Sequence, residues 1–240
     1  MRRLLYMLLS LTLLAACQQD ELQTVQDEAV LLLDLERMGR PTMAVTRACD
    51  ADLAVDILDA DRALYRHYDA GSVPQKIVLE PGTFVIQAYT DNQTTWTDAN
   101  EGKGEPCYFQ EVSVEMEYDM VKRLQMCVPM TNYAVGLQLP ALWDNLFRSY
   151  TFRLKSGGRT VVIQQGERAY FDVSDGGFSY ALSATNTDGR TSSHSAIPIT
   201  DIEAGKLYTL RYSYDSDATT GGVDIVITDD METDDNNVNL

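Results

Sequence analysis

Basic residues, histidines and cysteines are scarce in this sequence. The 240-residue chain carries 19 Lys and Arg against 36 Asp and Glu, which gives a formal net charge of −17. This balance excludes a nucleic-acid binder that works through bulk positive charge. With only two histidines and four cysteines, almost no ligands remain for a zinc site. We therefore expect no metal, no cofactor and no nucleic-acid partner.

Apolar residues, in contrast, are plentiful. They make up 45% of the chain, which is enough for a folded core and excludes global disorder. The length suits one large domain or two of ordinary size.

The N-terminus has the features of a lipoprotein signal peptide. Arg2 and Arg3 precede an apolar stretch, Leu4 to Ala16, that is too short to span a bilayer. It ends in Leu-Ala-Ala before Cys17, which resembles a bacterial lipobox. We predict a signal peptide over 1–16, lipidation of Cys17 and a lipidated linker over 17–27. An ordinary secretory signal followed by a chance cysteine is the alternative.

A short acidic run, Gln-Gln-Asp-Glu over 18–21, follows Cys17. It resembles the signal that exports Bacteroidetes lipoproteins to the outer face of the outer membrane. A solvated linker with random charge explains the run equally well.

The rest of the chain alternates apolar and polar residues with a period of two, which is typical of half-buried strands. Turn residues separate the runs, as in Glu80-Pro81-Gly82 and Asp188-Gly189. Many short strands at this spacing favour antiparallel β-sandwiches. The alternating sets include Leu31, Leu33 and Leu35; Leu53, Val55 and Ile57; Phe84, Ile86 and Ala88; Val112, Val114 and Met116; and Tyr208, Leu210 and Tyr212.

Two further features divide the chain. A single stretch, Pro140 to Phe147, has helical spacing, with Pro140 placed to begin it. The end of the chain, 229–240, is acidic and without periodicity, so we predict a disordered tail. We place the junction between two sandwiches near Pro129 to Asn132, with an N-terminal sandwich over 28–130 and a C-terminal one over 131–228.

Several segments carry a family likeness in their order and spacing. They include Thr46-Arg47-Ala48, Leu79-Glu80-Pro81-Gly82-Thr83-Phe84, Thr131-Asn132-Tyr133-Ala134-Val135 and Ala204-Gly205-Lys206-Leu207-Tyr208. Over residues 28–230 the chain resembles the two-domain fimbrillin-like lipoproteins of Bacteroidetes, a family largely of unknown function. The resemblance implies an all-β fold of two immunoglobulin- or transthyretin-like antiparallel sandwiches in tandem. It also implies surface display and no known catalysis.

After lipidation of Cys17, three cysteines remain. An exported protein can hold disulfides, so a bridge between Cys107 and Cys127 is one interpretation. The other is that Cys127 is a small buried apolar residue within a strand. Because three is an odd number, at least one thiol among Cys49, Cys107 and Cys127 stays free or pairs between molecules.

The sequence offers only weak candidates for a set of catalytic residues. His67 and His194 lie in polar stretches that we interpret as turn-like, and Ser193-His194-Ser195 lacks the Gly-x-Ser-x-Gly elbow of a hydrolase. Aspartate clusters around Asp59 and Asp217 do not follow EF-hand spacing and are interpreted as turns. We therefore expect a protein that is not an enzyme.

Aromatic residues offer the most plausible ligand platform. Tyr65, Tyr68, Trp96 and Tyr108 lie in or beside irregular segments of the first half, and flat rings there can stack on sugars. The alternative is that these rings cover the end of the sandwich core.

The function these features favour is that of a surface-exposed, outer-membrane-anchored lipoprotein. It would act in adhesion, or as an anchoring or tip subunit of a fimbria-like assembly with other fimbrial subunits as partners. The alternative is a glycan-binding accessory lipoprotein of a nutrient-uptake system.

Proteolysis after Arg47 is a further possibility that the family resemblance implies. In pilus-forming fimbrillins a segment ending near an arginine is cut away with the first strand, and another subunit then supplies a strand. An exposed, uncut linker at Thr46-Arg47-Ala48 is the alternative.

Overall fold

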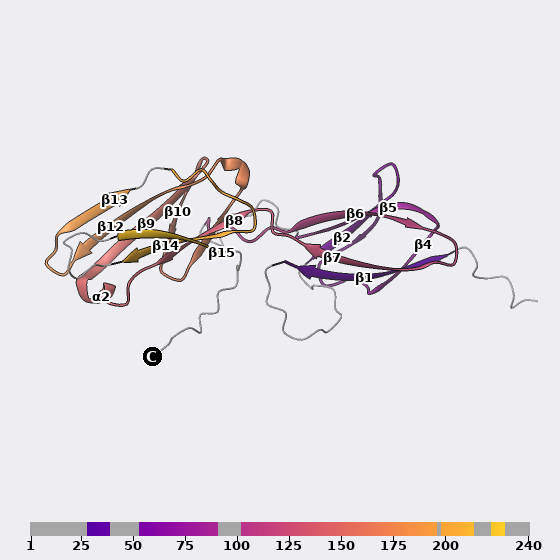
Figure 1. Cartoon of the computed structure of the whole chain (residues 1–240), viewed down its shortest axis with the longest axis horizontal. Coiled ribbons are helices and arrows are strands. Elements are labelled where there is room, and N and C mark those ends of the chain that lie inside the picture. The colour runs from indigo at the N-terminus through magenta and orange to yellow at the C-terminus, as the bar shows by residue number, and fades with distance from the viewer. Residues whose placement is uncertain (1–27, 39–52, 91–101, 196–197, 214–221, 229–240) are drawn as a thin grey trace, which may run out of the picture.

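The computed structural model describes residues 28–38, 53–90, 102–195, 198–213 and 222–228. Within these residues almost every regular element is a strand, arranged as two β-sandwiches (Figure 1). The predicted all-β class is therefore confirmed. No helix in the described part of the chain is long and apolar enough to cross a membrane.

The first sandwich packs a three-stranded sheet, in the order β4-β1-β7, against a four-stranded sheet, in the order β3-β2-β5-β6. Both sheets contribute their inner faces to one core, which contains Leu33, Val55 and Ile86. The strands are β1 (Ala29–Arg37), β2 (Ala54–Leu58), β3 (Leu64–Tyr68), β4 (Lys76–Leu79), β5 (Gly82–Tyr89), β6 (Phe109–Met116) and β7 (Val121–Val128).

Strand β1 is the central strand of its sheet. Its burial alternates as the leucine pattern predicts, with Leu31, Leu33 and Leu35 facing the core. It pairs antiparallel with β4 but parallel with β7. The predicted antiparallel sandwich therefore contains one parallel pair, which the sequence did not indicate. Period-two alternation reports which face of a strand is buried and carries no information about the direction of the neighbouring strand.

The second sandwich packs sheets in the orders β10-β9-β12-β13 and β11-β8-β14-β15. It also contains a parallel pair, β8 with β14. Its core is aromatic, with Tyr133, Phe152 and Phe171 fully buried. The elements are β8 (Tyr133–Gln138), α2 (Trp143–Leu146), β9 (Phe147–Ser156), β10 (Arg159–Ile163), β11 (Arg168–Phe171), η2 (Val173–Asp175), β12 (Ser179–Asn186), β13 (Thr191–Ser195), β14 (Leu207–Ser213) and β15 (Gly222–Thr228).

The helix predicted over Pro140 to Phe147 is shorter in the structure. Only Trp143–Leu146 is helical, because Phe147 already has the extended φ and ψ of −127° and 130° and begins β9. From Phe147 the chain pairs with β12, so sheet hydrogen bonds replace a further helical turn.

The two sandwiches meet where β7 leads through residues 129–132 into β8. Contacts cross this junction. The backbone N–H of Tyr170 donates to the carbonyl oxygen of Lys103 at 2.7 Å, and the Lys103 ammonium pairs with Glu167 at 2.8 Å. Ala134 and Leu207 of the second sandwich also pack in the core cluster of the first. The division into domains 28–130 and 131–228 therefore stays a prediction.

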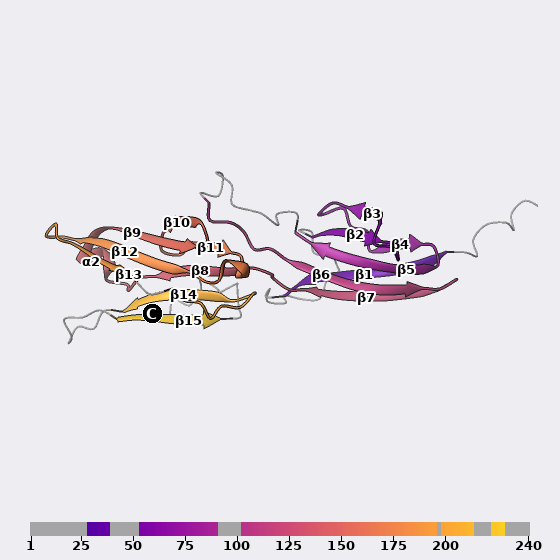
Figure 2. The same cartoon turned by 90° about the horizontal axis from the view of Figure 1, so that it is seen from above.

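The sandwiches follow one another along the long axis of the molecule (Figures 1 and 2). Strand β1 begins beside the β6–β7 turn, where Val30 pairs with Val121, and runs alongside β7 toward the junction. Strand β8 continues away from the junction and leads to α2. The start of β1 and helix α2 therefore lie at opposite ends of the molecule, which we call the β1 pole and the α2 pole.

Candidate functional site

Strand β3 is the most exposed edge of the first sandwich. It pairs only with β2 in its sheet, and Leu64 is 61% exposed. A bulge lies between Ile57 and Leu58 of the partner strand. Such bulges and charged side chains protect an edge against unwanted pairing. The residues Leu64-Tyr65-Arg66-His67-Tyr68 place aromatic and charged groups on both sides of this edge.

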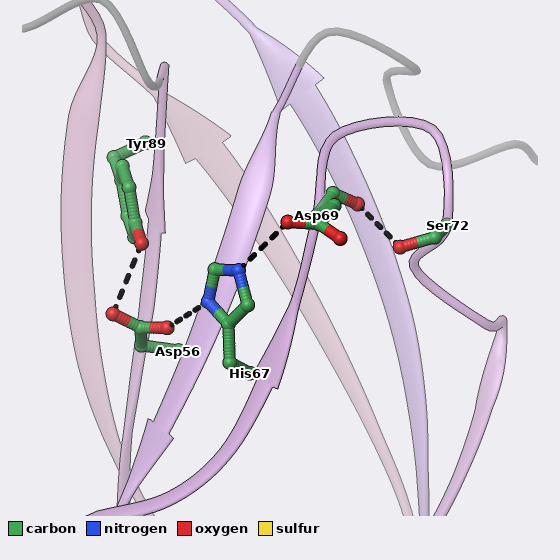
Figure 3. Close-up of polar contacts among 5 residues, drawn as sticks. All are labelled: Asp56, His67, Asp69, Ser72 and Tyr89. Carbon is green, nitrogen blue, oxygen red and sulfur yellow. Dashed lines mark hydrogen bonds and ion pairs between the residues drawn. The ribbon is translucent and has the colours of Figure 1, made fainter.

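His67 is the centre of a polar cluster on β2, β3 and β5 (Figure 3). Its Nδ1 lies 2.6 Å from Oδ1 of Asp56, and its Nε2 lies 3.0 Å from Oδ1 of Asp69. The Tyr89 hydroxyl donates to the other carboxylate oxygen of Asp56 at 3.0 Å. Cross-strand pairing of Asp56 with His67, and of Asp56 with Gln87 on β5, brings these groups to one face.

The surroundings of His67 favour its protonated form. Hydrogen bonds to Asp56 first, and to Asp69 next, raise the pKa of the imidazole above its ordinary value. Both ring nitrogens donate when the ring is charged, which matches two carboxylate partners. When protonated, His67 therefore joins β2, β3 and the turn after β3 through both ring nitrogens.

The same geometry argues against a hydrolase triad, although serine, histidine and aspartate lie together. The Ser72 hydroxyl donates to the backbone carbonyl of Asp69 at 2.7 Å, not to the imidazole. The second nitrogen of His67 faces a carboxylate, so no ring nitrogen is placed to take a proton from Ser72. The triad chemistry requires that contact.

The polar face continues across the sheet. Gln87 donates to Glu111 on β6 at 3.0 Å, and the Arg62 guanidinium pairs with the same carboxylate at 2.9 Å. The hydrogen bond from Arg62 lowers the pKa of Glu111. Exposed pairs of this kind contribute little to stability.

The structure separates the aromatic residues that we predicted as a stacking platform. Tyr65 and Tyr68 both lie on β3, and the Arg66 guanidinium lies over the Tyr65 ring and donates to the Tyr68 hydroxyl. Tyr108 is only 7% exposed and packs in the core, so it offers no face to a ligand. Trp96 lies outside the described residues. A four-ring platform is therefore not formed by the described part.

The cysteine predictions need correction. No disulfide joins Cys107 and Cys127. The backbone N–H of Thr131 donates to the carbonyl oxygen of Cys107, which places Cys107 four residues beyond Cys127 on the facing chain. Four residues of strand span about 13 Å, well beyond the reach of a disulfide. Cys127 is also exposed rather than buried, while Cys107 is buried.

Other predicted residues lie outside the described part of the chain. These are the lipidation site Cys17, the processing site Arg47 and Cys49. Among the described residues, no group of three or more histidine, cysteine, aspartate and glutamate side chains is placed to hold a metal ion. Asp59 instead accepts backbone hydrogen bonds within its own turn, from Asp61 at 3.0 Å and Ala63 at 2.9 Å.

Sequence reasoning missed the His67 cluster because it placed both histidines in turns. His67 lies in β3 and His194 in β13. Neither strand has the apolar alternation that signals a half-buried strand, because both are exposed edges. The sequence feature that could have placed His67 in a strand is the hairpin turn at Asp59 to Arg62. Such a turn implies that the residues after it pair back with β2.

One protein family, described as a domain of unknown function (DUF4493), matches residues 14–240. No curated protein matches the sequence. A candidate cell adhesion protein from Bacteroides eggerthii has a similar structure, at 14% identity and a TM-score of 0.51, over 85% of this chain and 96% of that one.

Two further solved structures are similar. A candidate cell adhesion protein from Bacteroides uniformis is 11% identical with a TM-score of 0.50, over 88% of this chain and 100% of that one. The C-terminally truncated tip fimbrial protein Mfa3 from Porphyromonas gingivalis is 10% identical with a TM-score of 0.45, over 83% of this chain and 99% of that one. At such identities the likeness to the two Bacteroides proteins concerns the fold.

Proposed function

Because the chain belongs to the family described as a domain of unknown function (DUF4493), and has the fold of a candidate cell adhesion protein, we propose that it acts in adhesion at the cell surface. In this proposal Cys17 carries lipid and anchors the chain in the outer membrane. The protein then serves as a surface adhesin, or as an anchoring or tip subunit of a fimbria-like assembly. Two or more acyl chains on one residue are enough for stable anchoring.

The observation that carries the proposal is the position of β1. This strand begins at the β1 pole, and α2 lies at the opposite end of the molecule. The segment between Cys17 and Glu28 spans at most roughly 40 Å when extended. A lipid on Cys17 would thus keep the β1 pole near the membrane and leave the second sandwich free to project outward.

The pairing of β1 supports an anchoring role over a polymerising one. β1 hydrogen-bonds to β4 on one side and β7 on the other, and its inner leucines are buried. Cleavage after Arg47 would remove β1 together with the lipid and expose two sheet edges and an apolar slot. The acidic tail over 229–240 is too polar to fill that slot in another copy. We therefore propose that the mature chain keeps β1.

The test is the intact mass and N-terminal sequence of the protein taken from cells. We expect a chain that begins at acylated Cys17 and is digested by protease added to whole cells. Cys17→Ala should abolish the acyl mass and release the protein from the membrane. A Cys17→Ala variant that matures and partitions into detergent like the natural chain would contradict the anchor. A mature chain that begins at Ala48 would contradict the anchoring role and indicate a polymerising subunit.

A further inference from the structure

The α2 pole holds an aromatic cluster that closes the end of the second sandwich. Trp143 on α2 stacks on Phe147, with ring centroids 4.1 Å apart and planes at 23°. Tyr150 on β9 meets the indole edge-on at 6.0 Å, and Tyr212 on β14 lies at 6.5 Å. His194 on β13 lies 6.3 Å from Tyr212. Four elements thus bring rings together at this pole.

Within the described part of the chain, two polar atoms in this cluster are buried without a hydrogen-bond partner. They are Nε1 of Trp143 and the hydroxyl oxygen of Tyr212. The two residues are only 9% and 8% exposed. Burial raises the pKa of Tyr212 well above its ordinary value, so the hydroxyl keeps its proton and remains a donor.

Unpaired donors of this kind are unusual. Tyrosine hydroxyls and tryptophan N–H groups normally find a partner when they are buried, since leaving them unpaired is costly. Two other tyrosines of this sandwich follow the rule. The Tyr133 hydroxyl pairs with Ser156 at 3.1 Å, and the Tyr150 hydroxyl accepts from the Gln165 N–H at 2.9 Å. Two neighbouring exceptions at one pole therefore require an explanation.

Helix α2, which carries Trp143, is weakly held. It consists of four residues and has no side-chain cap at its N-terminus. One backbone hydrogen bond, from Thr187 to Leu146 at 3.1 Å, joins it to the β12–β13 hairpin. Leu142 just before it is 64% exposed. Such a short, lightly bonded element opens locally at low cost.

We propose that the α2 pole is a binding site for a neutral carbohydrate, which enters when α2 opens and accepts hydrogen bonds from Tyr212 on β14 and from Trp143, which moves with α2. The donors require a ligand rich in acceptors, and the aromatic faces require one with apolar C–H faces. A neutral pyranose has both. The inference rests on the proposed adhesive function, because it names the class of surface that the outward pole would bind.

The experiment uses the full-length chain with Cys17→Ala and an array of neutral malto-, xylo-, manno- and mucin-type oligosaccharides, followed by calorimetry on those that bind. We expect at least one to bind. Tyr212→Phe should weaken its binding about tenfold, the effect of one lost hydrogen bond, and Trp143→Phe at least as much. The thermal unfolding midpoint of Tyr212→Phe should stay equal or rise, because the variant removes an unpaired buried hydroxyl.

Tyr133→Phe is the matched control. It removes a paired hydroxyl elsewhere in the same core, so it should lower the unfolding midpoint and leave oligosaccharide binding unchanged. A Trp96→Phe chain leaves Trp143 as the one remaining tryptophan, whose emission should shift when the oligosaccharide binds.

Two results would overturn the proposal: no oligosaccharide on the array binds, or binding survives in both Tyr212→Phe and Trp143→Phe. Because the measurement uses soluble protein, its failure is distinct from failure of the anchor. Acylated Cys17 together with adhesion of whole cells would leave the proposed function in place even if no carbohydrate binds.

Discussion

At the scale of single residues, the protonation of the His67 side chain is linked to the attachment of the edge strand β3 to β2. Its ring is shared between Asp56 on β2 and Asp69 after β3, and Tyr89 from β5 supports Asp56. Among the described residues, these are the titratable groups of the hydrogen-bonded cluster around the imidazole. The cluster is solvent-exposed, so its effect on stability is modest and sensitive to salt.

The raised pKa of His67 predicts a pH dependence of stability. A group whose pKa is higher in the folded state stabilises that state fully below its unfolded value, which is about 6.5 for histidine. The stabilisation is lost as the pH rises through the native pKa. The thermal unfolding midpoint should therefore decrease across this range, and His67→Asn should remove that decrease. His194→Asn is the control and should keep it; an unchanged profile in His67→Asn would contradict the assignment.

At the scale of secondary-structure elements, a buried central strand differs from the exposed strands at the sheet edges. β1 is enclosed by β4 and β7, whereas β3 and β13 each have one paired side. All residues of β13 are exposed, and its sequence, Thr-Ser-Ser-His-Ser, is polar throughout. Polar edges of this kind discourage uncontrolled strand addition. Changes in β1 should therefore affect stability more than changes in these edge strands.

The burial of β1 predicts a strong asymmetry between neighbouring leucines. Leu33 is 1% exposed and lies in the core, whereas Leu32 lies on the other face and is half-buried. Leu33→Ala should lower the free energy of unfolding by about 2–5 kcal/mol, through lost burial and a residual cavity. Leu32→Ala is the matched control and should cost less than about 1 kcal/mol. Denaturant unfolding measures both; equal effects would place β1 outside the core.

At the scale of the whole molecule, the two sandwiches are linked by more than the connecting strand. The loop between β5 and β6 reaches the second sandwich through Lys103, and Asn132 at the junction binds that loop. Its side chain accepts from the Cys107 N–H at 3.0 Å and donates to the Glu105 carbonyl at 2.8 Å. These contacts join the two sandwiches in addition to the connecting chain.

The junction contacts predict that Asn132 matters to the whole molecule. Asn132→Ala leaves two backbone groups without their partner and should lower the free energy of unfolding by about 1–3 kcal/mol. Asn145→Ala on the exposed side of α2 is the control and should change it by less than about 0.5 kcal/mol. Fragments 28–130 and 131–228 should each unfold at a lower temperature than the full chain, since both lose these contacts. Equal unfolding temperatures would show that the sandwiches are independent.

By itself, the sequence determined the properties that depend on neighbouring residues. The alternation of Leu31, Leu33 and Leu35 predicted their burial, because side chains in a strand point to opposite faces at every step. The same rule was available for Cys127: it lies between Met126 and Val128, which face the core, and so it faces solvent. That error came from assigning a cysteine by its residue type rather than by its position in the strand.

Only the tertiary structure decided which strands and side chains meet. Three features involve residues that lie far apart in the chain or on different elements. They are the parallel pairing of β1 with β7, the approach of Asp56 and Asp69 to His67, and the unpaired donors of Trp143 and Tyr212. The local sequence pattern carries no information about such partners, because many strand orders bury the same faces equally well. The His67 cluster and the aromatic cluster at the α2 pole arise from those non-local contacts.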